Sequence, residues 1–168
     1  MGSKPKIILG IDPGTRVTGY GVIDGERNPL DYGCIKPPPK LSLEARYHVL
    51  FTSLEALIDR YQPQAVAVES QFVLKNAQSA IKLGMAKGMA FLAAAKRQIP
   101  VYEFAPKQAK LAVVGKGGAS KIQVQKMIQA LLRLPILPEP ADAADALALA
   151  ICCYNHLRNP CTNTFTAS

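Results

Sequence analysis

The hydrophobic pattern of the first part of the chain predicts three strands. Residues 6–12 (KIILGID) form a short apolar run that ends in Asp-Pro-Gly, which is typical of a buried strand entering a turn. Residues 17–24 and 30–36 are rich in strand-forming residues and are separated by a turn over residues 25–29. We therefore expect an antiparallel meander, followed by a proline-rich loop over residues 36–40.

The rest of the chain alternates between helical and strand patterns. Ser42 precedes apolar residues at helical spacing, which predicts a helix that ends near Tyr61. The pattern then predicts a strand at 64–69, a helix at 76–98, a strand at 101–104, and helices at 106–115, 120–134 and 141–157. This order indicates an α/β fold with a mixed five-stranded sheet flanked by helices.

The length and composition are those of a globular protein. With 168 residues, the chain is expected to form a single domain over residues 1–168, with flexible segments at 1–6 and 158–168. No apolar run approaches the roughly 18 residues of a membrane span, and residues 1–6 lack the apolar stretch of a signal peptide. We therefore expect a soluble, cytoplasmic protein. Four cysteines without C-x-x-C spacing argue against a zinc site.

The charge balance indicates a polyanionic partner. The chain has 20 Lys and Arg residues against 12 Asp and Glu residues, which gives a net charge of +8. A compact basic domain attracts polyanions, and nucleic acid is the most common one inside a cell. A basic surface without any special function remains the alternative.

Four acidic residues stand where acidic residues are unusual. Asp12 and Glu69 each end a predicted apolar strand, and Asp142 and Asp145 lie in the alanine-rich segment ADAADALALA. Carboxylates near a core are costly unless a cation neutralises them, and only Arg16 lies close to any of them in the sequence. Ligands of α/β sheets gather beyond the carboxyl ends of strands, and residues three apart share a helix face. We therefore expect the four acids to converge.

An all-carboxylate donor set favours hard divalent cations. Oxygen donors without histidine or cysteine suit Mg²⁺, with Mn²⁺ as a possible substitute. Two such ions about 4 Å apart can activate a water molecule and stabilise the leaving oxygen of a phosphodiester, so we expect two ions per site. Simpler explanations stay open: Asp12 closing a turn, Glu69 on the surface, and Asp142 and Asp145 as helix-capping or first-turn acids.

Three segments of the chain resemble the RuvC family of bacterial crossover (Holliday) junction endodeoxyribonucleases. They are ILGIDPGTRVTGYGVI, VAVESQFVLKNAQSAIKLGMAKG and ADAADALALA. The resemblance implies a ribonuclease-H-like fold and a homodimer that uses Mg²⁺ to nick two symmetric strands of a four-way DNA junction, in homologous recombination and DNA repair. It also implies RuvA and RuvB, the branch-migration proteins, as partners. The acidic tetrad of the family falls on the same four acids, as catalytic residues and metal ligands.

The resemblance also implies DNA-binding residues. Phe72 matches an aromatic residue that stacks on a base near the junction centre, although a core position would otherwise be expected for it. Lys110 and Lys121 match basic residues near the scissile phosphate. Three other lysines lie close to these residues in the sequence and are candidates to hold the DNA backbone: Lys75, Lys107 and Lys116.

The predicted helix at 76–98 carries a stripe of small and apolar residues, where we expect the homodimer interface, as in the family. The stripe consists of Ala77, Ala80, Ile81, Gly84, Gly88, Phe91 and Ala95. A stripe that packs only within one protomer is the alternative. Two other functions also remain open: a junction-binding protein with weak catalysis, and an actin-like ATPase, suggested by Gly10-x-Asp12-x-Gly14.

Overall fold

A computed structural model of the chain describes residues 7–70 and 76–159, and the following statements concern these residues. The predicted flexible segments lie almost entirely outside them. The elements in chain order are β1 (Ile7–Asp12), β2 (Thr18–Asp24), β3 (Pro29–Ile35), α1 (Leu43–Tyr61), β4 (Ala65–Glu69), α2 (Ala77–Ala95), β5 (Val101–Phe104), α3 (Pro106–Val114), α4 (Lys121–Leu131) and α5 (Ala141–Arg158). None of the described helices is long and apolar enough to cross a bilayer.

The strands form one mixed sheet in the order β3-β2-β1-β4-β5. The β1–β2 and β2–β3 pairs are antiparallel, as expected for the meander, whereas β1–β4 and β4–β5 are parallel. In the central parallel pair, Ile11 lies opposite Val68. The residues that follow them, Asp12 and Glu69, therefore end neighbouring strands at the same edge of the sheet.

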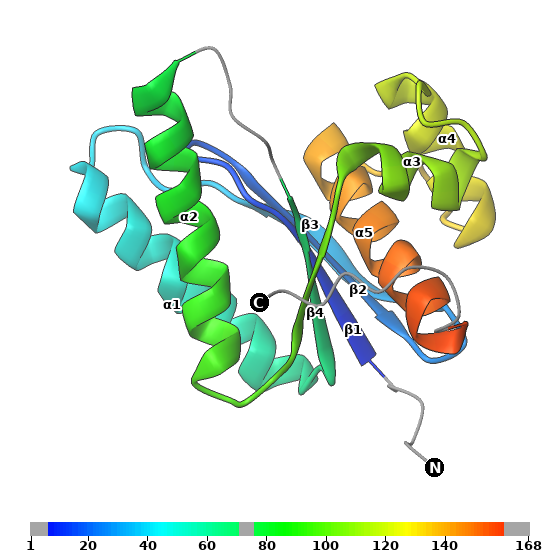
Figure 1. The fold of residues 1–168 in the computed structure, drawn as a ribbon, viewed down its shortest axis with the longest axis horizontal. Helices are drawn as coiled ribbons and strands as arrows, with labels where there is room; N and C mark the ends of the chain where they lie inside the picture. The colour runs from blue at the N-terminus through cyan, green and yellow to red at the C-terminus, as the bar shows by residue number, and fades with distance from the viewer. Residues whose placement is uncertain (1–6, 71–75, 160–168) are drawn as a thin grey trace.

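Helices cover both faces of the sheet (Figure 1). Helices α1 and α2 lie on one face, where Leu9 and Ile11 of β1 contribute to their apolar cluster. Helix α5 lies on the other face with α3 and α4 beside it, and Ile8 belongs to that second cluster. Because side chains alternate along β1, one strand supplies both layers of the core.

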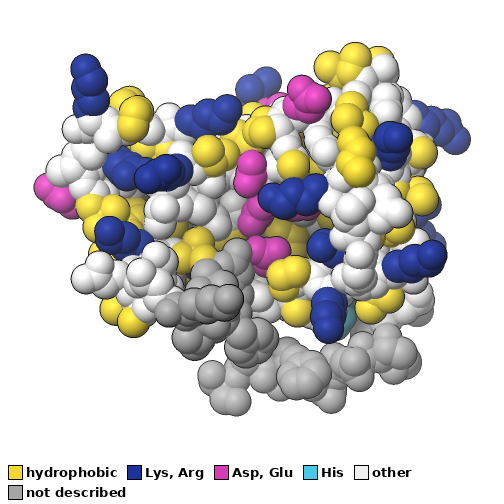
Figure 2. Space-filling model, turned by 90° about the horizontal axis from the view of Figure 1, so that it is seen from above, with side chains coloured by type: hydrophobic (Ala, Val, Ile, Leu, Met, Phe, Trp, Pro, Cys, Tyr) yellow, Lys and Arg dark blue, Asp and Glu magenta, His cyan; other side chains and the backbone are white. Residues whose placement is uncertain are grey.

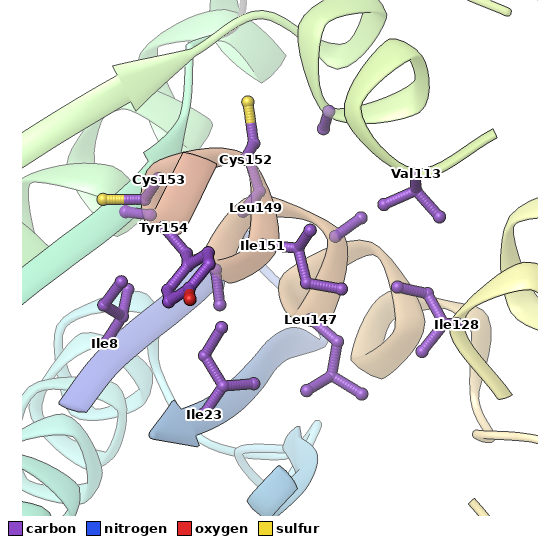
Figure 3. Packing of buried hydrophobic residues seen from close by; sticks show 14 of the residues in the cluster. Ile8, Ile23, Val113, Ile128, Leu147, Leu149, Ile151, Cys152, Cys153 and Tyr154 are labelled. Atoms are coloured by element: carbon purple, nitrogen blue, oxygen red, sulfur yellow. The ribbon is translucent and has the colours of Figure 1, made fainter. Parts of the chain in front are cut away.

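Helix α5 is the most deeply buried helix of the fold, and Figure 3 shows its apolar side chains between the sheet and α4. The helix approaches the sheet closely because glycines lie beneath it. A Cβ atom on Gly10 would lie 2.0 Å from the carbonyl oxygen of Ala146, and one on Gly19 would lie 2.0 Å from that of Asp142. Both distances are far below a van der Waals contact, so only glycine fits at these positions.

The predicted elements agree with the structure; strand bounds differ by at most one residue, and the largest differences lie at two helix ends. Helix α2 ends at Ala95 rather than at residue 98, and α4 ends at Leu131 rather than at residue 134. In each case the chain leaves the helix through a turn that contains a non-glycine residue with positive φ, Gln98 (55°) and Arg133 (53°). Such residues are uncommon in that conformation, so sequence patterns do not mark these ends.

Candidate functional site

Two of the predicted acids come from neighbouring strand ends and face α5. Asp12 lies on the same side of β1 as Gly10, which contacts α5, because side chains alternate along a strand. In the same way, Glu69 shares its side of β4 with Ala67, which packs in the α5 cluster. Both carboxylates therefore emerge where the sheet meets the beginning of α5.

The other two acids come from the first turns of α5. Asp142 lies in the first turn, and Asp145 follows three residues later on the same face. The residue before the helix is Pro140, so the alternative that Asp142 is the N-cap is wrong. The backbone of Asp142 lies directly over Gly19, which is paired with Asp12 in the β1–β2 ladder. This contact carries the acids of α5 to the strand ends.

The four acids line one cavity of about 360 Å³. Figure 2 shows acidic side chains gathered near the middle of this face, with basic side chains next to them. The cavity is lined by Asp12, Pro13, Gly14, Val17, Glu69, Pro106, Ala109, Lys110, Lys121, Val124, Asp142, Asp145, Ala148 and Leu149. Residues from five segments of the chain thus form a single acidic site with two lysines in its wall.

Asp12 is the acid of the cavity for which ionisation is least favourable. Burial raises the pKa of Asp12 to about 8, and the negative charges of the three other acids add to the effect, that of Glu69 most strongly. A hydrogen bond between the side chains of Asp12 and Glu69 acts in the same direction. Without a cation, burial and the neighbouring charges therefore favour the protonated form of Asp12.

Two lysines compensate part of the negative charge. Burial raises the pKa of Asp145, and the ammonium groups of Lys121 and Lys110 oppose this change. Only Arg16 lies close to the acids in the sequence, but in the fold α3 and α4 bring Lys110 and Lys121 into the cavity wall, the two lysines that the resemblance implies near the scissile phosphate. The residue pattern alone does not show this proximity, because both lysines lie more than twenty residues from every acid.

The donor chemistry of the cavity fits a hard cation. The candidate donor atoms are the carboxylate oxygens of the four acids, and a divalent ion would relieve the repulsion between them. Within residues 7–70 and 76–159, however, no three His, Cys, Asp or Glu side chains form a ready-made coordination shell. Cation binding would therefore require carboxylates to turn toward one another and Asp12 to release its proton.

The remaining DNA-binding candidates fall into two groups. Lys107 in α3 and Lys116 in the following loop are exposed and do not line the cavity. Phe72 and Lys75 lie outside the described residues. The structure thus places Lys110 and Lys121 at the acids, and Lys107 and Lys116 on the adjacent surface.

The predicted stripe on α2 faces mainly away from the protomer. The buried residues of this helix are four other residues: Ala86, Ala90, Ala93 and Ala94. Ile81 is 63% exposed, and a Cβ atom on Gly84 or Gly88 would meet nothing within 4 Å. Only Phe91 of the stripe packs against the α1/α2 cluster. The alternative of a stripe that serves only internal packing is therefore wrong for most of its residues.

Two residues that hold the loop after Asp12 carry no clear signal in the sequence. The hydroxyl of Thr18 bonds to Gly14, and the guanidinium of Arg46 in α1 donates to the carbonyl oxygen of Thr15. A threonine in an apolar strand and an arginine in a helix are both unremarkable by pattern, and the partner of Arg46 is 31 residues away.

Comparison with known proteins gives concordant results. A profile of the family described as crossover junction endodeoxyribonuclease RuvC matches residues 8–153. The crossover junction endodeoxyribonuclease RuvC of Protochlamydia amoebophila is 61% identical over 153 residues, which cover 89% of this chain and 91% of that protein.

Solved structures agree with these sequence matches. The structure of Thermus thermophilus RuvC has a TM-score of 0.83 and 33% identity, and covers 92% of this chain and 96% of its own. T. thermophilus RuvC in complex with Holliday junction substrate has a TM-score of 0.82 and 32% identity, over 90% and 94% of the two chains. The family match spans most of the chain, including all four acids, and the chain therefore belongs to the RuvC family of crossover junction endodeoxyribonucleases.

Proposed function

We propose that this protein resolves four-way DNA junctions by cutting two symmetric strands, with Asp12, Glu69, Asp142 and Asp145 as catalytic residues and ligands of two Mg²⁺ ions. It is a Holliday junction endonuclease of homologous recombination and DNA repair. The observation that carries the site assignment is the convergence of these acids, from two strand ends and one helix, in a single cavity with two lysines.

The acids have a common task, which is to bind and orient the metal ions at the scissile phosphate. Bound Mg²⁺ would supply a water molecule of lowered pKa and neutralise charge on the leaving oxygen, and Mn²⁺ would serve as a substitute. Asp12 must give up its proton when a cation binds, because its pKa is raised to about 8 by burial and by the other acids. Metal loading should therefore become easier toward alkaline pH.

The lysines supply the attraction for DNA. Lys110 and Lys121 stand in the cavity wall, where their ammonium groups can contact the phosphate next to the cut. Lys107 and Lys116 extend the positive charge along the adjacent surface. Phe72 and Lys75, which follow Glu69 in the sequence, would bind an unstacked base and the backbone.

A homodimer through α2 would place two such sites on one junction. The exposed side chains of Ile81 (63%), Met85 (47%) and Leu92 (50%) follow one side of this helix at spacings of four and seven residues. Apolar residues at that spacing suit a helix-to-helix contact. A two-fold axis through the contact would direct the sites to equivalent strands. RuvA and RuvB as partners, and a cytoplasmic location, complete the proposal.

The direct test is cleavage of a synthetic four-way junction in which each strand is labelled in turn. With Mg²⁺, we expect nicks at symmetric positions on two opposing strands, and no nicks in a linear duplex of the same sequence. Asp12→Asn should bind the junction at least as tightly but not cut it, since it removes a negative charge and a metal ligand. Binding without any cutting by the wild type would instead favour a junction-binding protein with weak catalysis, and Mg²⁺-dependent cutting by Asp12→Asn would refute the site assignment.

A further inference from the structure

We infer that Thr18 and Arg46 are positioning residues for the nuclease site, because they fix the loop at residues 13–17 that follows Asp12. Neither residue lines the cavity. The inference rests on the proposed function, since it assigns the loop to the same metal-binding site. Thr18 and Arg46 lie on the face of the sheet opposite to the acids and hold the Asp12 carboxylate in place from there.

The hydroxyl of Thr18 closes the loop with two reciprocal hydrogen bonds. The amide nitrogen of Gly14 donates to Thr18 Oγ1 at 3.2 Å, and Oγ1 donates to the carbonyl oxygen of Gly14 at 3.0 Å. Thr18 is only 1% exposed and, together with Gln125, is one of two buried polar residues in the described part of the chain. Water cannot replace these bonds at such a site, so the hydroxyl is the element that fixes the loop.

The closed loop forms part of the cavity wall. Pro13, Gly14 and Val17 line the cavity next to Asp12. The loop folds back on itself so tightly that a Cβ atom on Gly14 would lie 2.1 Å from the carbonyl oxygen of Val17. A change in loop shape therefore moves this wall and the backbone that carries the Asp12 carboxylate.

Arg46 ties the same loop to a second element. Its Nη2 donates to the carbonyl oxygen of Thr15, which joins the loop to the first turns of α1. The Nε atom of Arg46 is buried without a hydrogen-bond partner in the described part of the chain. Burying a donor without a partner costs free energy. The hydrogen bond of this guanidinium to the loop backbone gives a reason for its position, which is to fix the loop.

Both ties act from the side of the sheet opposite to the acids. Thr18 shares its side of β2 with Tyr20 and Val22, which pack in the α1/α2 cluster, whereas Asp12 faces α5. Thr18 and Arg46 therefore act on the site through the loop and not through a side chain in the cavity. This geometry separates a positional effect from the loss of a ligand.

The test compares Thr18→Val, which keeps the shape but removes the hydroxyl, with Thr18→Ser, which keeps the hydroxyl. Mn²⁺ affinity of the DNA-free protein is measured by calorimetry, together with junction affinity, junction cleavage and the Mg²⁺ concentration for half-maximal cleavage. We expect Thr18→Val to bind Mn²⁺ several-fold more weakly, to need more Mg²⁺, and to cut about 10- to 100-fold more slowly, with unchanged junction affinity. Thr18→Ser should stay close to wild type.

A matched control removes a threonine hydroxyl from elsewhere. Thr52 in α1 also bonds to backbone carbonyls, those of His48 and Val49, but it is exposed, and Thr52→Val should leave metal affinity and cleavage unchanged. All assays are run at temperatures where circular dichroism shows each variant folded. If Thr18→Val does not fold, Arg46→Met takes its place, with the same expected direction and a smaller effect.

The outcomes are separable. Wild-type Mn²⁺ affinity and cleavage in folded Thr18→Val would overturn the inference, as would equal losses in Thr18→Ser and Thr18→Val, or wild-type values in Arg46→Met where that variant is needed. Failure of the wild type to cut the junction would instead refute the proposed function. The Mn²⁺ affinities would still decide the positional role of the loop.

Discussion

At the scale of single residues, Asp12 is the acid whose pKa is changed most clearly by its surroundings. Its carboxyl ends a buried strand and faces three other acids, and both burial and these charges raise its pKa, so the protonated form is favoured when no cation is bound. The side chains of Asp12 and Glu69 share a hydrogen bond, which also favours a proton on this pair. The proposed metal binding would therefore release a proton from the site, and the stability of the metal-free protein is expected to depend on pH.

The first prediction concerns the stability of the metal-free protein. The folded-state pKa of Asp12, about 8, lies above its ordinary value of 3.8. The contribution of Asp12 to the free energy of unfolding is therefore fully present below about pH 4 and is lost as the pH rises through about 8. Asp12→Asn stays neutral at every pH and can still form a hydrogen bond with Glu69. In EDTA, the Tm of the wild type should fall more between about pH 5 and about pH 9 than that of Asp12→Asn.

The size of this effect follows from linkage. A difference of one between the folded and unfolded pKa corresponds to about 1.4 kcal/mol, which shifts the Tm of a domain of this length by about 2–4 °C or more. Asp12→Asn should therefore be several degrees more stable than the wild type at alkaline pH. Glu26→Gln, which alters an exposed acid, is the control and should follow the wild-type curve. Parallel curves for Asp12→Asn and the wild type would contradict the account.

At the scale of secondary-structure elements, two helices have different tasks. Helix α5 carries two acids and lies directly on β1 and β2, because glycine faces alanine at the contact, as between Gly10 and Ala146. Helix α2 buries only its alanines and leaves apolar side chains in solvent. The first arrangement brings two acids to the cavity, and the second leaves the apolar surface that we propose as the dimer contact.

The exposed side of α2 leads to a prediction about assembly. Ile81→Glu places a charge in the proposed contact and should convert the dimer to monomers, since burying an unpaired carboxylate is costly. Light scattering after size exclusion should give about twice 18.1 kDa for the wild type and about 18.1 kDa for the variant. Ile136→Glu is a matched control, because Ile136 is 68% exposed but lies outside α2. A dimeric Ile81→Glu variant would exclude this interface.

At the scale of the whole molecule, the fold follows from patterns that are local in the sequence. Apolar runs ending in Asp12 and Glu69 indicated the strands, and the spacing of Asp142 and Asp145 indicated a shared helix face. These signals depend on neighbouring residues, so the elements and the mixed sheet could be predicted. The resemblance to the RuvC family supplied the homodimer and the DNA-binding candidates.

Features that depend on distant residues could not be predicted from patterns. The loop contacts of Thr18 and Arg46, and the approach of Lys121 to Asp145, join segments whose proximity only the folded chain defines. The alanines of α5 suggested a close approach to the sheet, but the matching role of Gly19 becomes visible only when the register is known. Contacts between segments that are distant in the sequence were therefore harder to predict than the residue types at the site.

The most direct test of the central claim is the location of bound metal. A crystal of the protein soaked in Mn²⁺ would be measured for anomalous scattering. We expect difference peaks in the cavity between Asp12, Glu69, Asp142 and Asp145, with carboxylate oxygens about 2.0–2.3 Å from each ion. Peaks only elsewhere, or an empty cavity at Mn²⁺ concentrations that support cleavage, would contradict the assignment of these acids as one metal-binding site.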